Sequence, residues 1–334
     1  MKAIILENKN FDGLVLQGTV KPVPGNGEAL VQVRASALNR RDIWIVQGLY
    51  PKIKVPVILG SDGAGIVSKV GEGVDTNWLH KEVIINPCFN WGDNPRIPQK
   101  DYSILGLPAN GTQAEFVVVP VSNLYEKPGH LNFEEAAAIP LAGLTGYRAL
   151  FIRGELQQDE TVMVTGIGGG VASIMLEMAV AIGARVIVTS GDDAKIAKAT
   201  RQGAHGGANY KNENWEEKIS RLYGENGIDL IVDGTGGDGF NQLISLIKPA
   251  GRIVVYGASA GKPTQLHIHR IFWKQISIKG TTVGRDQDFK EMLQFIKNYK
   301  IKPPIYSVYS FDEFKEAYLE MIESKQYGKI VIVP

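Results

Sequence analysis

The sequence predicts a two-domain α/β protein, in which a β-rich part is followed by a parallel sheet whose strands alternate with helices. Its 334 residues are enough for two domains and a large buried core. Short apolar segments separated by Gly-rich turns fill the first third, and no long helical pattern appears before about residue 132. From residue 161 onward, strand and helix patterns take turns, which is typical of a doubly wound sheet.

The β-rich part begins with a strand at the first residues and continues with Glu28–Ala37, where apolar and polar residues alternate. Further strands are expected at 66–70, 83–85 and 116–119. A helix then begins after Asn132, which can cap it, since Glu135 follows three residues later as in a capping box.

The second part is predicted from its alternating periods. Strands are expected at 161–165, 185–189, 208–210, 229–233, 252–256 and 275–283. Helices are expected at 172–182, 193–201, 215–222 and 240–247. Two more helices, at 288–298 and 311–323, and a terminal strand at 329–333 complete the chain.

The composition excludes several classes of function. The formal net charge of +1 argues against a nucleic-acid partner, and no run of about 20 apolar residues predicts a membrane span. A single cysteine, Cys88, excludes an intramolecular disulfide framework and favours a reducing, cytoplasmic compartment. The first residues are too soon interrupted by charge to read as a signal peptide.

A glycine-rich loop follows the apolar strand at 161–165. Glycines there permit a tight turn and a close approach of the backbone to a pyrophosphate, and the next helix offers free N–H groups. The spacing is a shifted form of the usual fingerprint, because valine occupies its last position. We predict that the dinucleotide is bound by Gly166, Gly168, Gly169, Gly170 and Val171.

The end of the second strand of this part favours NADP(H) over NAD(H). NAD enzymes place a carboxylate there to hold the ribose hydroxyls, whereas this chain has Ser190, which can donate a hydrogen bond to a 2′-phosphate. Asp192 and Asp193 follow and add negative charge nearby. We interpret both as residues that cap the next helix and complement its dipole.

Five motifs in order resemble the medium-chain dehydrogenases, and the glycine spacing resembles their quinone oxidoreductase-like branch, which lacks zinc. They are Asn39-x-x-Asp42, Gly60-Ser61-Asp62-x-x-Gly65, Leu141-Ala-Gly-Leu-Thr145-Gly-Tyr147, the glycine loop, and the segment from Gly251 to Gly257. The resemblance implies a GroES-like β-rich catalytic domain at 1–125 and 284–334. It also implies a Rossmann domain at 126–283, with the active site in the cleft between the two.

The resemblance also assigns roles to individual residues. Lys195 and Tyr210 match residues that hold the 2′-phosphate, although they also read as a solvated helix residue and a packing aromatic. Thr145 matches a residue that contacts the nicotinamide, and Gly257 belongs to the cofactor site. A homodimer is expected, with the strand at 275–283 pairing with its copy, because an edge strand invites such pairing.

No metal site is expected. The zinc-binding relatives take their ligands from positions that match Asn39, Ser61 and Leu141. Asparagine is a poor zinc ligand, serine is a rare one, and leucine cannot bind zinc. The stretch matching their structural zinc lobe, 86–109, contains only Cys88. His267 and His269 are expected on one strand face, where a pair without a third ligand is structural.

Without a metal, a substrate must spread its own charge. A metal ion supplies several kcal/mol to a developing oxyanion, whereas a side-chain amide or indole N–H supplies about 1–3 kcal/mol. We therefore expect Asn39 to act as a donor near the substrate, to cap the helix near residue 40, or to do both. Trp44 offers a flat apolar wall and one hydrogen-bond donor, but its indole cannot give up a proton at useful pH. We therefore expect solvent or Tyr50 to supply the proton. Arg41 is expected to point outward as a solvated charge, and only an inward orientation would let it bind an acidic substrate or phosphate.

The resulting hypothesis is an NADPH-dependent oxidoreductase that transfers hydride to a quinone or an α,β-unsaturated carbonyl compound without a metal. One alternative is an alcohol or aldehyde dehydrogenase with an unorthodox metal site. The other is an NADPH-binding sensor or structural protein with little turnover.

Overall fold

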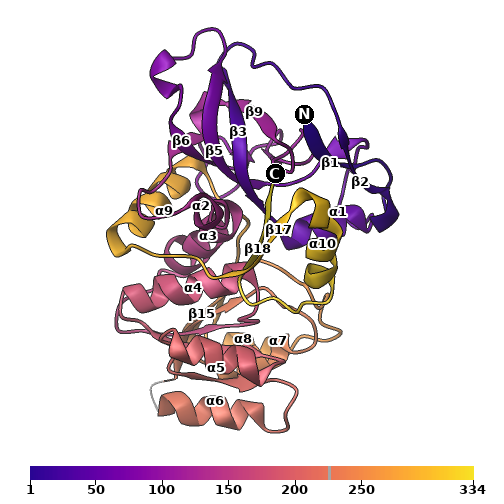
Figure 1. The fold of residues 1–334 in the computed structure, drawn as a ribbon. Helices are drawn as coiled ribbons and strands as arrows, with labels where there is room; N and C mark the ends of the chain where they lie inside the picture. The colour runs from indigo at the N-terminus through magenta and orange to yellow at the C-terminus, as the bar shows by residue number, and fades with distance from the viewer. Residues whose placement is uncertain (225–226) are drawn as a thin grey trace. The chain divides into compact units, whose positions relative to one another are not determined.

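The computed structural model describes residues 1–224 and 227–334, which form two compact units (Figure 1). The first unit combines Met1–Leu144 with Gly284–Pro334, and the second is Thr145–Val283. The division falls at Leu144 instead of residue 125, because helix α2 (Phe133–Ala137) packs on strands of the first unit.

The first unit is built on a seven-stranded sheet around β3 (Glu28–Ala37). β3 pairs antiparallel with three strands, β5 (Asp62–Val70), β9 (Phe116–Pro120) and β18 (Lys329–Val333). The remaining strands are β6 (Glu82–Ile85), β10 (Leu124–Glu126) and β17 (Ile305–Ser310). The last strand of the chain therefore lies beside β3, which brings the C-terminal segment into a sheet formed mainly by residues 28–126.

Smaller elements complete this unit. A three-stranded sheet contains β1 (Lys2–Leu6), β2 (Leu14–Gly18) and β4 (Val57–Ile58), and β7 (Cys88–Phe89) pairs with β8 (Ser103–Ile104). The helices are α1 (Arg40–Val46), α2, α9 (Asp286–Tyr299) and α10 (Phe314–Ile322), and α3 (Pro140–Tyr147) runs across the division. Buried residues of α1, α10 and β18 share one apolar core, which fixes the start of α1 against the C-terminal strand.

The second unit contains a six-stranded parallel sheet in the order β13-β12-β11-β14-β15-β16. Its strands are β11 (Thr161–Val164), β12 (Arg185–Ser190), β13 (Gly206–Asn209), β14 (Ile228–Asp233), β15 (Ile247–Val255) and β16 (Ser277–Gly280). Its helices are α4 (Gly170–Ala181), α5 (Asp193–Arg201), α6 (Trp215–Tyr223), α7 (Phe240–Leu246) and α8 (Ile268–Trp273). α4 and α5 contact β11 to β13, while α6 and α7 pack together over a separate apolar cluster. This architecture confirms the predicted fold class, a β-rich domain and a doubly wound parallel sheet.

The prediction was wrong for the segment before the last strand of this sheet. His267 precedes α8 and His269 lies within it, so the two do not share a strand face, although their rings are 5.9 Å apart. The strand itself is shorter than 275–283, because only Ser277–Gly280 pairs with β15. Among the described residues, no helix combines the length and apolar character needed to span a bilayer.

Candidate active site

Asn39 lies at the junction between β3 and α1 and is 7% exposed. Its backbone is extended, with φ −127° and ψ 154°. Its Nδ2 donates to Asp62 Oδ2 at 3.0 Å, and its Oδ1 accepts from Lys329 Nζ at 2.7 Å. The helix start is instead held by Asp42, whose Oδ2 accepts from the backbone N–H of Asn39 at 2.8 Å. Two charged groups therefore orient the Asn39 amide.

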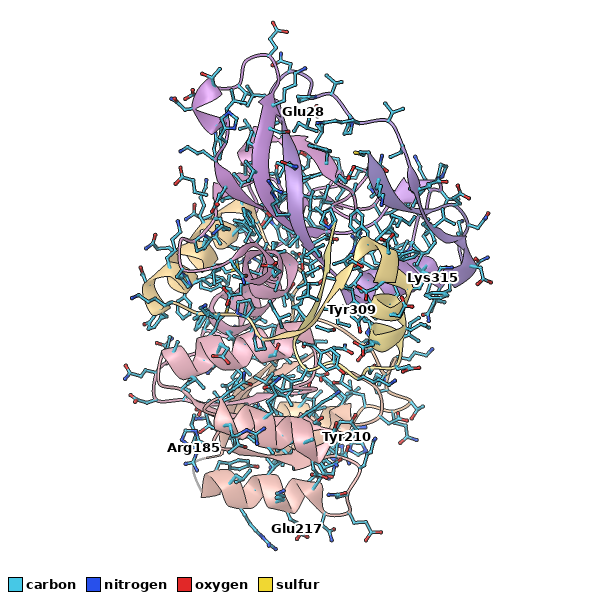
Figure 2. All side chains as sticks on the ribbon, in the orientation of Figure 1. Glu28, Arg185, Tyr210, Glu217, Tyr309 and Lys315 are labelled. Atoms are coloured by element: carbon cyan, nitrogen blue, oxygen red, sulfur yellow. The ribbon has the colours of Figure 1, made fainter. Side chains whose placement is uncertain are left out.

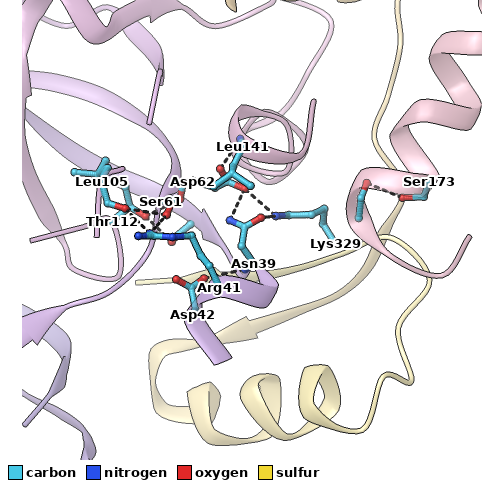
Figure 3. A network of polar contacts seen from close by, with 12 residues as sticks. Asn39, Arg41, Asp42, Ser61, Asp62, Leu105, Thr112, Leu141, Ser173 and Lys329 are labelled. Carbon is cyan, nitrogen blue, oxygen red and sulfur yellow. Dashed lines mark hydrogen bonds and ion pairs between the residues drawn. The ribbon is translucent and has the colours of Figure 1, made fainter. Parts of the chain in front are cut away.

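Asp62 connects three segments that are distant in sequence (Figure 3). Its Oδ2 also accepts from Lys329 Nζ at 2.8 Å, and its Oδ1 accepts from the backbone N–H of Leu141 at 2.7 Å. The side chains of Asp62 and Lys329 are 0% and 3% exposed, so this is a buried ion pair with additional hydrogen bonds. Hydrogen bonds thereby bring residues 39, 62 and 141 together, beside Ser61.

Arg41 points inward, which corrects the expectation of an outward, solvated charge. It is 7% exposed, and its Nη1 donates to Ser61 Oγ at 2.5 Å and to the Leu105 carbonyl at 2.9 Å. Ser61 Oγ donates to the same carbonyl at 2.8 Å. The guanidinium carbon lies 5.1 Å from the centre of the Tyr50 ring. Arg41 therefore has the inward orientation, which is the one that would let it bind an acidic substrate or phosphate.

Asp42 is fully buried behind this cluster. Burial raises the pKa of its carboxyl to about 6, and the positive charge of Arg41, the Asn39 N–H and Lys329 oppose that rise. Its Oδ1 has no hydrogen-bond partner, so half of the carboxylate remains unsatisfied. Asp42 therefore titrates nearer to neutral pH than an ordinary aspartate.

The other two residues predicted for catalysis lie on helices. Trp44 is half-buried in α1, three residues after Arg41. Thr145 is 5% exposed in α3 and belongs to the second unit. Tyr50, one of the two predicted proton sources, is half-buried.

The positions that match zinc ligands do not fit a zinc ion. The amide oxygen of Asn39 is bonded to an ammonium group, the Ser61 hydroxyl is bonded to a guanidinium, and Leu141 has no ligand atom in its side chain. Burial raises the pKa of Cys88 to about 11, which keeps its thiol protonated. Within 1–224 and 227–334, no three His, Cys, Asp or Glu side chains are grouped to hold a metal.

The glycine loop of the second unit fits a pyrophosphate. Gly166, with φ +63°, turns the chain after β11, and Gly169 caps the twelve-residue helix α4 without a side chain in the way. Gly168, Gly170 and Val171 are partly exposed around it. Asp233 holds the residue that precedes the loop, since its Oδ1 accepts from Thr165 Oγ1 at 2.6 Å. The backbone N–H groups at the start of α4 are thus available to phosphate oxygens.

Ser190 and Tyr210 lie at the carboxyl ends of the neighbouring strands β12 and β13, and Lys195 lies in the first turn of α5, which follows β12. Ser190 is opposite Asn209 in the β12–β13 register, and Tyr210 follows β13 at the surface of the second unit, 48% exposed (Figure 2). A Cβ built on Gly191 would lie 2.8 Å from both the Tyr210 hydroxyl and Lys211 Cε, so these side chains close over Gly191. Burial lowers the pKa of Lys195, the negative charge of Asp192 opposes that change, and the positive charge of Lys211 adds to it.

The two aspartates beside this cluster have structural partners. Asp192 Oδ1 accepts from the N–H of Ala194 and caps α5, and Asp193 Oδ2 accepts from Asn209 Nδ2 at 2.9 Å. This is the capping role expected for Asp192. Gly257 follows β15 and faces the backbone of Gly234, beyond the end of β14, at the same edge of the sheet.

Two residues of these clusters were not predicted. The sequence predicts Lys329 only as the first residue of the terminal strand, and the signal that could identify it is a lysine at the start of a run of apolar residues. Lys211 was overlooked although it adjoins Tyr210 after β13, a position where side chains meet those of the neighbouring strand.

The fold and the order of the motifs define a two-domain dehydrogenase or reductase, and comparisons with known proteins specify the family. Residues 25–129 match the alcohol dehydrogenase GroES-like domain, and residues 170–298 match the zinc-binding dehydrogenase domain. The zinc-type alcohol dehydrogenase-like protein YogA of Leptosphaeria maculans is 36% identical over 96% of this chain and 94% of its own. The acryloyl-coenzyme A reductase of Sulfurisphaera tokodaii is 28% identical over the full length of both chains.

The crystal structure of an NAD-dependent alcohol dehydrogenase superposes with a TM-score of 0.95, at 34% identity and with 100% of each chain covered. The chain therefore belongs to the medium-chain dehydrogenase/reductase superfamily, in its zinc-type alcohol dehydrogenase-like group, and is an oxidoreductase. This confirms the family that the five motifs indicated.

Proposed function

We propose that this protein is an NADP(H)-dependent reductase that transfers hydride to a quinone or an α,β-unsaturated carbonyl compound without a metal. The observation that supports the proposal is the set of contacts made by the two residues that match zinc ligands, Asn39 and Ser61. Asn39 and Ser61 are bonded to Lys329 and Arg41, so cationic side chains stand where a zinc ion would need free donors. The alternative, an alcohol or aldehyde dehydrogenase with an unorthodox metal site, would have to break both contacts.

The chemistry of the acceptor follows from these donors. When bound, the reduced nicotinamide supplies the hydride. Asn39 has one Nδ2–H on Asp62 and a second one left to donate, which makes it the proposed catalytic donor. One such bond contributes about 1–3 kcal/mol, less than a metal would, which favours acceptors that delocalise the incoming charge. An acryloyl-coenzyme A reductase among the relatives has a name that fits this class of acceptor.

NADP(H) is the proposed cofactor because positive and neutral donors surround the end of β12. Lys195 and Lys211 interact electrostatically there, Ser190 keeps its hydroxyl proton for donation, and Tyr210 closes the site. The two carboxylates that follow β12 are both engaged, since Asp192 caps α5 and Asp193 accepts from Asn209. These groups suit a dianionic 2′-phosphate better than a pair of ribose hydroxyls.

The test is the oxidation of NADPH and NADH by purified protein with a panel of quinones, enones, simple ketones and aldehydes. The proposal predicts turnover with NADPH and a conjugated acceptor, and little with unconjugated ketones. Alcohol oxidation that requires stoichiometric zinc would instead support the dehydrogenase alternative. Tight NADPH binding without consumption across the panel would support a sensor.

A homodimer formed through the β16 edge is also proposed. β16 ends the strand order and pairs only with β15 on the described part of the chain, and Ile278 on it is 40% exposed. The adjoining helix α8 exposes Phe272 and Trp273 at 60% and 83%. An open strand edge flanked by apolar side chains is suited to pairing with its own copy.

A cytoplasmic location is the remaining part of the proposal. It rests on the single cysteine, Cys88, which is buried and leaves no means of forming a stabilising intramolecular disulfide. Detection of the protein in the cytosolic fraction of its own cells would test it.

A further inference from the structure

Arg41 is buried, and only one of the three nitrogen atoms of its guanidinium has hydrogen-bond acceptors in the part of the chain that the structure describes. Its Nη1 donates to Ser61 Oγ and to the carbonyl of Leu105. Its Nε is buried without an acceptor, and its Nη2 has no acceptor among the described residues. None of the ion pairs formed within 1–224 and 227–334 includes Arg41. One edge of the group is therefore anchored, and the other edge is buried without an acceptor from the described residues.

This second edge is the one that recognises planar anions. Nε and Nη2 lie on the same side of a guanidinium and present two parallel N–H groups, which match the two oxygens of a carboxylate. Buried N–H groups of a cation that lack an acceptor are costly, so a fold that keeps them inside has a ligand for them or a compensating gain in function. The chemistry of the free edge specifies a ligand with a negatively charged oxygen.

The nearest acid of the protein does not fill this edge. Asp42 is the next residue, but its Oδ2 accepts from the Asn39 backbone and its Oδ1 is itself without a partner. Asp62 is occupied by Lys329, Asn39 and the N–H of Leu141. Figure 3 shows the guanidinium reaching Ser61, beside the Asn39, Asp62 and Lys329 cluster.

We propose that Arg41 binds a negatively charged oxygen of the carbonyl substrate through its Nε and Nη2. The inference rests on the proposed function and names its substrate chemistry. The oxygen is either a permanent carboxylate of the substrate or the oxyanion that forms during reduction. In the second case, hydride from NADPH forms a C–H bond at the β-carbon, and the π electrons of the alkene move to give an enolate whose oxygen carries the charge. A proton from solvent then reaches the α-carbon, so that the enone is reduced and NADPH is oxidised to NADP⁺.

Kinetics with two matched acceptors distinguish the sources of the charge. 3-Penten-2-one is neutral, and 4-oxo-2-pentenoate replaces its terminal methyl group with a carboxylate. Arg41→Lys keeps the positive charge but removes the two parallel N–H groups of Nε and Nη2. Arg34→Lys is the matched control, which makes the same change at an exposed position of β3. If the oxygen is a substrate carboxylate, R41K lowers kcat/KM about 10- to 100-fold for the acid alone. If it is the oxyanion, kcat falls by a similar factor for both acceptors.

The overturning result is an R41K enzyme that matches wild type and R34K on both acceptors. Calorimetric titration of the wild-type protein with benzoate, and with benzamide as the neutral isostere, decides the question even if R41K does not fold. Benzoate should bind at least tenfold more tightly than benzamide, and R41K should abolish that preference when it folds. Equal binding of the two compounds by the wild type, or an unchanged preference in R41K, would refute the role of Arg41. If the wild type reduces no carbonyl compound with NADPH, the proposed function fails. The benzoate titration still tests whether Arg41 binds an anionic oxygen.

Discussion

Replacing Lys329 with Met should destabilise the first unit severely, because it leaves Asp62 as a buried charge without its ion-pair partner. Lys329 is 3% exposed at its side chain and Asp62 is 0% exposed. The change removes two hydrogen bonds, one of 2.7 Å to Asn39 Oδ1 and one of 2.8 Å to Asp62 Oδ2. Breaking a buried pair by removing one partner costs about 3–5 kcal/mol. For a domain of this size, that corresponds to a fall in Tm of about 6–20 °C.

Thermal unfolding followed by circular dichroism measures the effect. Lys325→Met is the matched control, since Lys325 pairs with Glu323 at the surface, and we expect a change below about 0.5 kcal/mol. The double variant D62N/K329M removes both charges and should lose less stability than the sum of the two single variants. A K329M protein as stable as K325M would refute the reasoning, because the ion pair would then contribute nothing to the fold.

Three further predictions follow from the other sites. Ser190→Asp should raise the KM for NADPH at least about tenfold and leave that for NADH nearly unchanged, because a carboxylate repels a 2′-phosphate; equal effects in steady-state kinetics would count against NADP(H). Burial raises the pKa of Asp42 from 3.8 to about 6, so the folded state holds a proton that the unfolded chain has released, and its contribution to the free energy of unfolding declines by about 3 kcal/mol as pH rises from about 4 to 7. Urea unfolding at pH 5 and pH 8 should show about 1.4 kcal/mol of this decline in wild type and a flatter profile in D42N, and the same slope in both would contradict the assignment. Ile278→Lys should convert the proposed dimer to monomer in sedimentation experiments because it places a charge on the open edge of β16, and a stable dimer of this variant would exclude this interface.

The periodic elements could be read from the sequence because their burial patterns are regular. Asp193–Arg201 and Lys329–Val333 occur with the predicted bounds, and Gly166 makes the turn that the loop requires. Helix α8 was missed because it has only six residues, fewer than two turns, which is too short for its apolar residues to show a helical period. The strand after it was overextended for the related reason that β-forming residues do not reveal where pairing stops.

The site was less predictable than the fold because it depends on contacts between distant residues. Asp62 and Lys329 are separated by 267 positions, and they meet because β5 and β18 both pair with β3. The direction of Arg41 was wrong because a charged side chain in a short helix is normally solvated, and burial of an unpaired charge is unfavourable. A local rule that fails in this way is itself informative, since such exceptions concentrate at functional sites.

The central claim is that Arg41, Lys329 and Asn39 replace a metal at the acceptor side of the site. The most direct test is to measure the metal content of the purified protein together with NADPH-dependent enone reduction, before and after dialysis against a strong chelator. The account predicts substoichiometric zinc and an unchanged rate after chelation. Zinc bound at one ion per chain, with activity that is lost on chelation and restored by zinc, would contradict it.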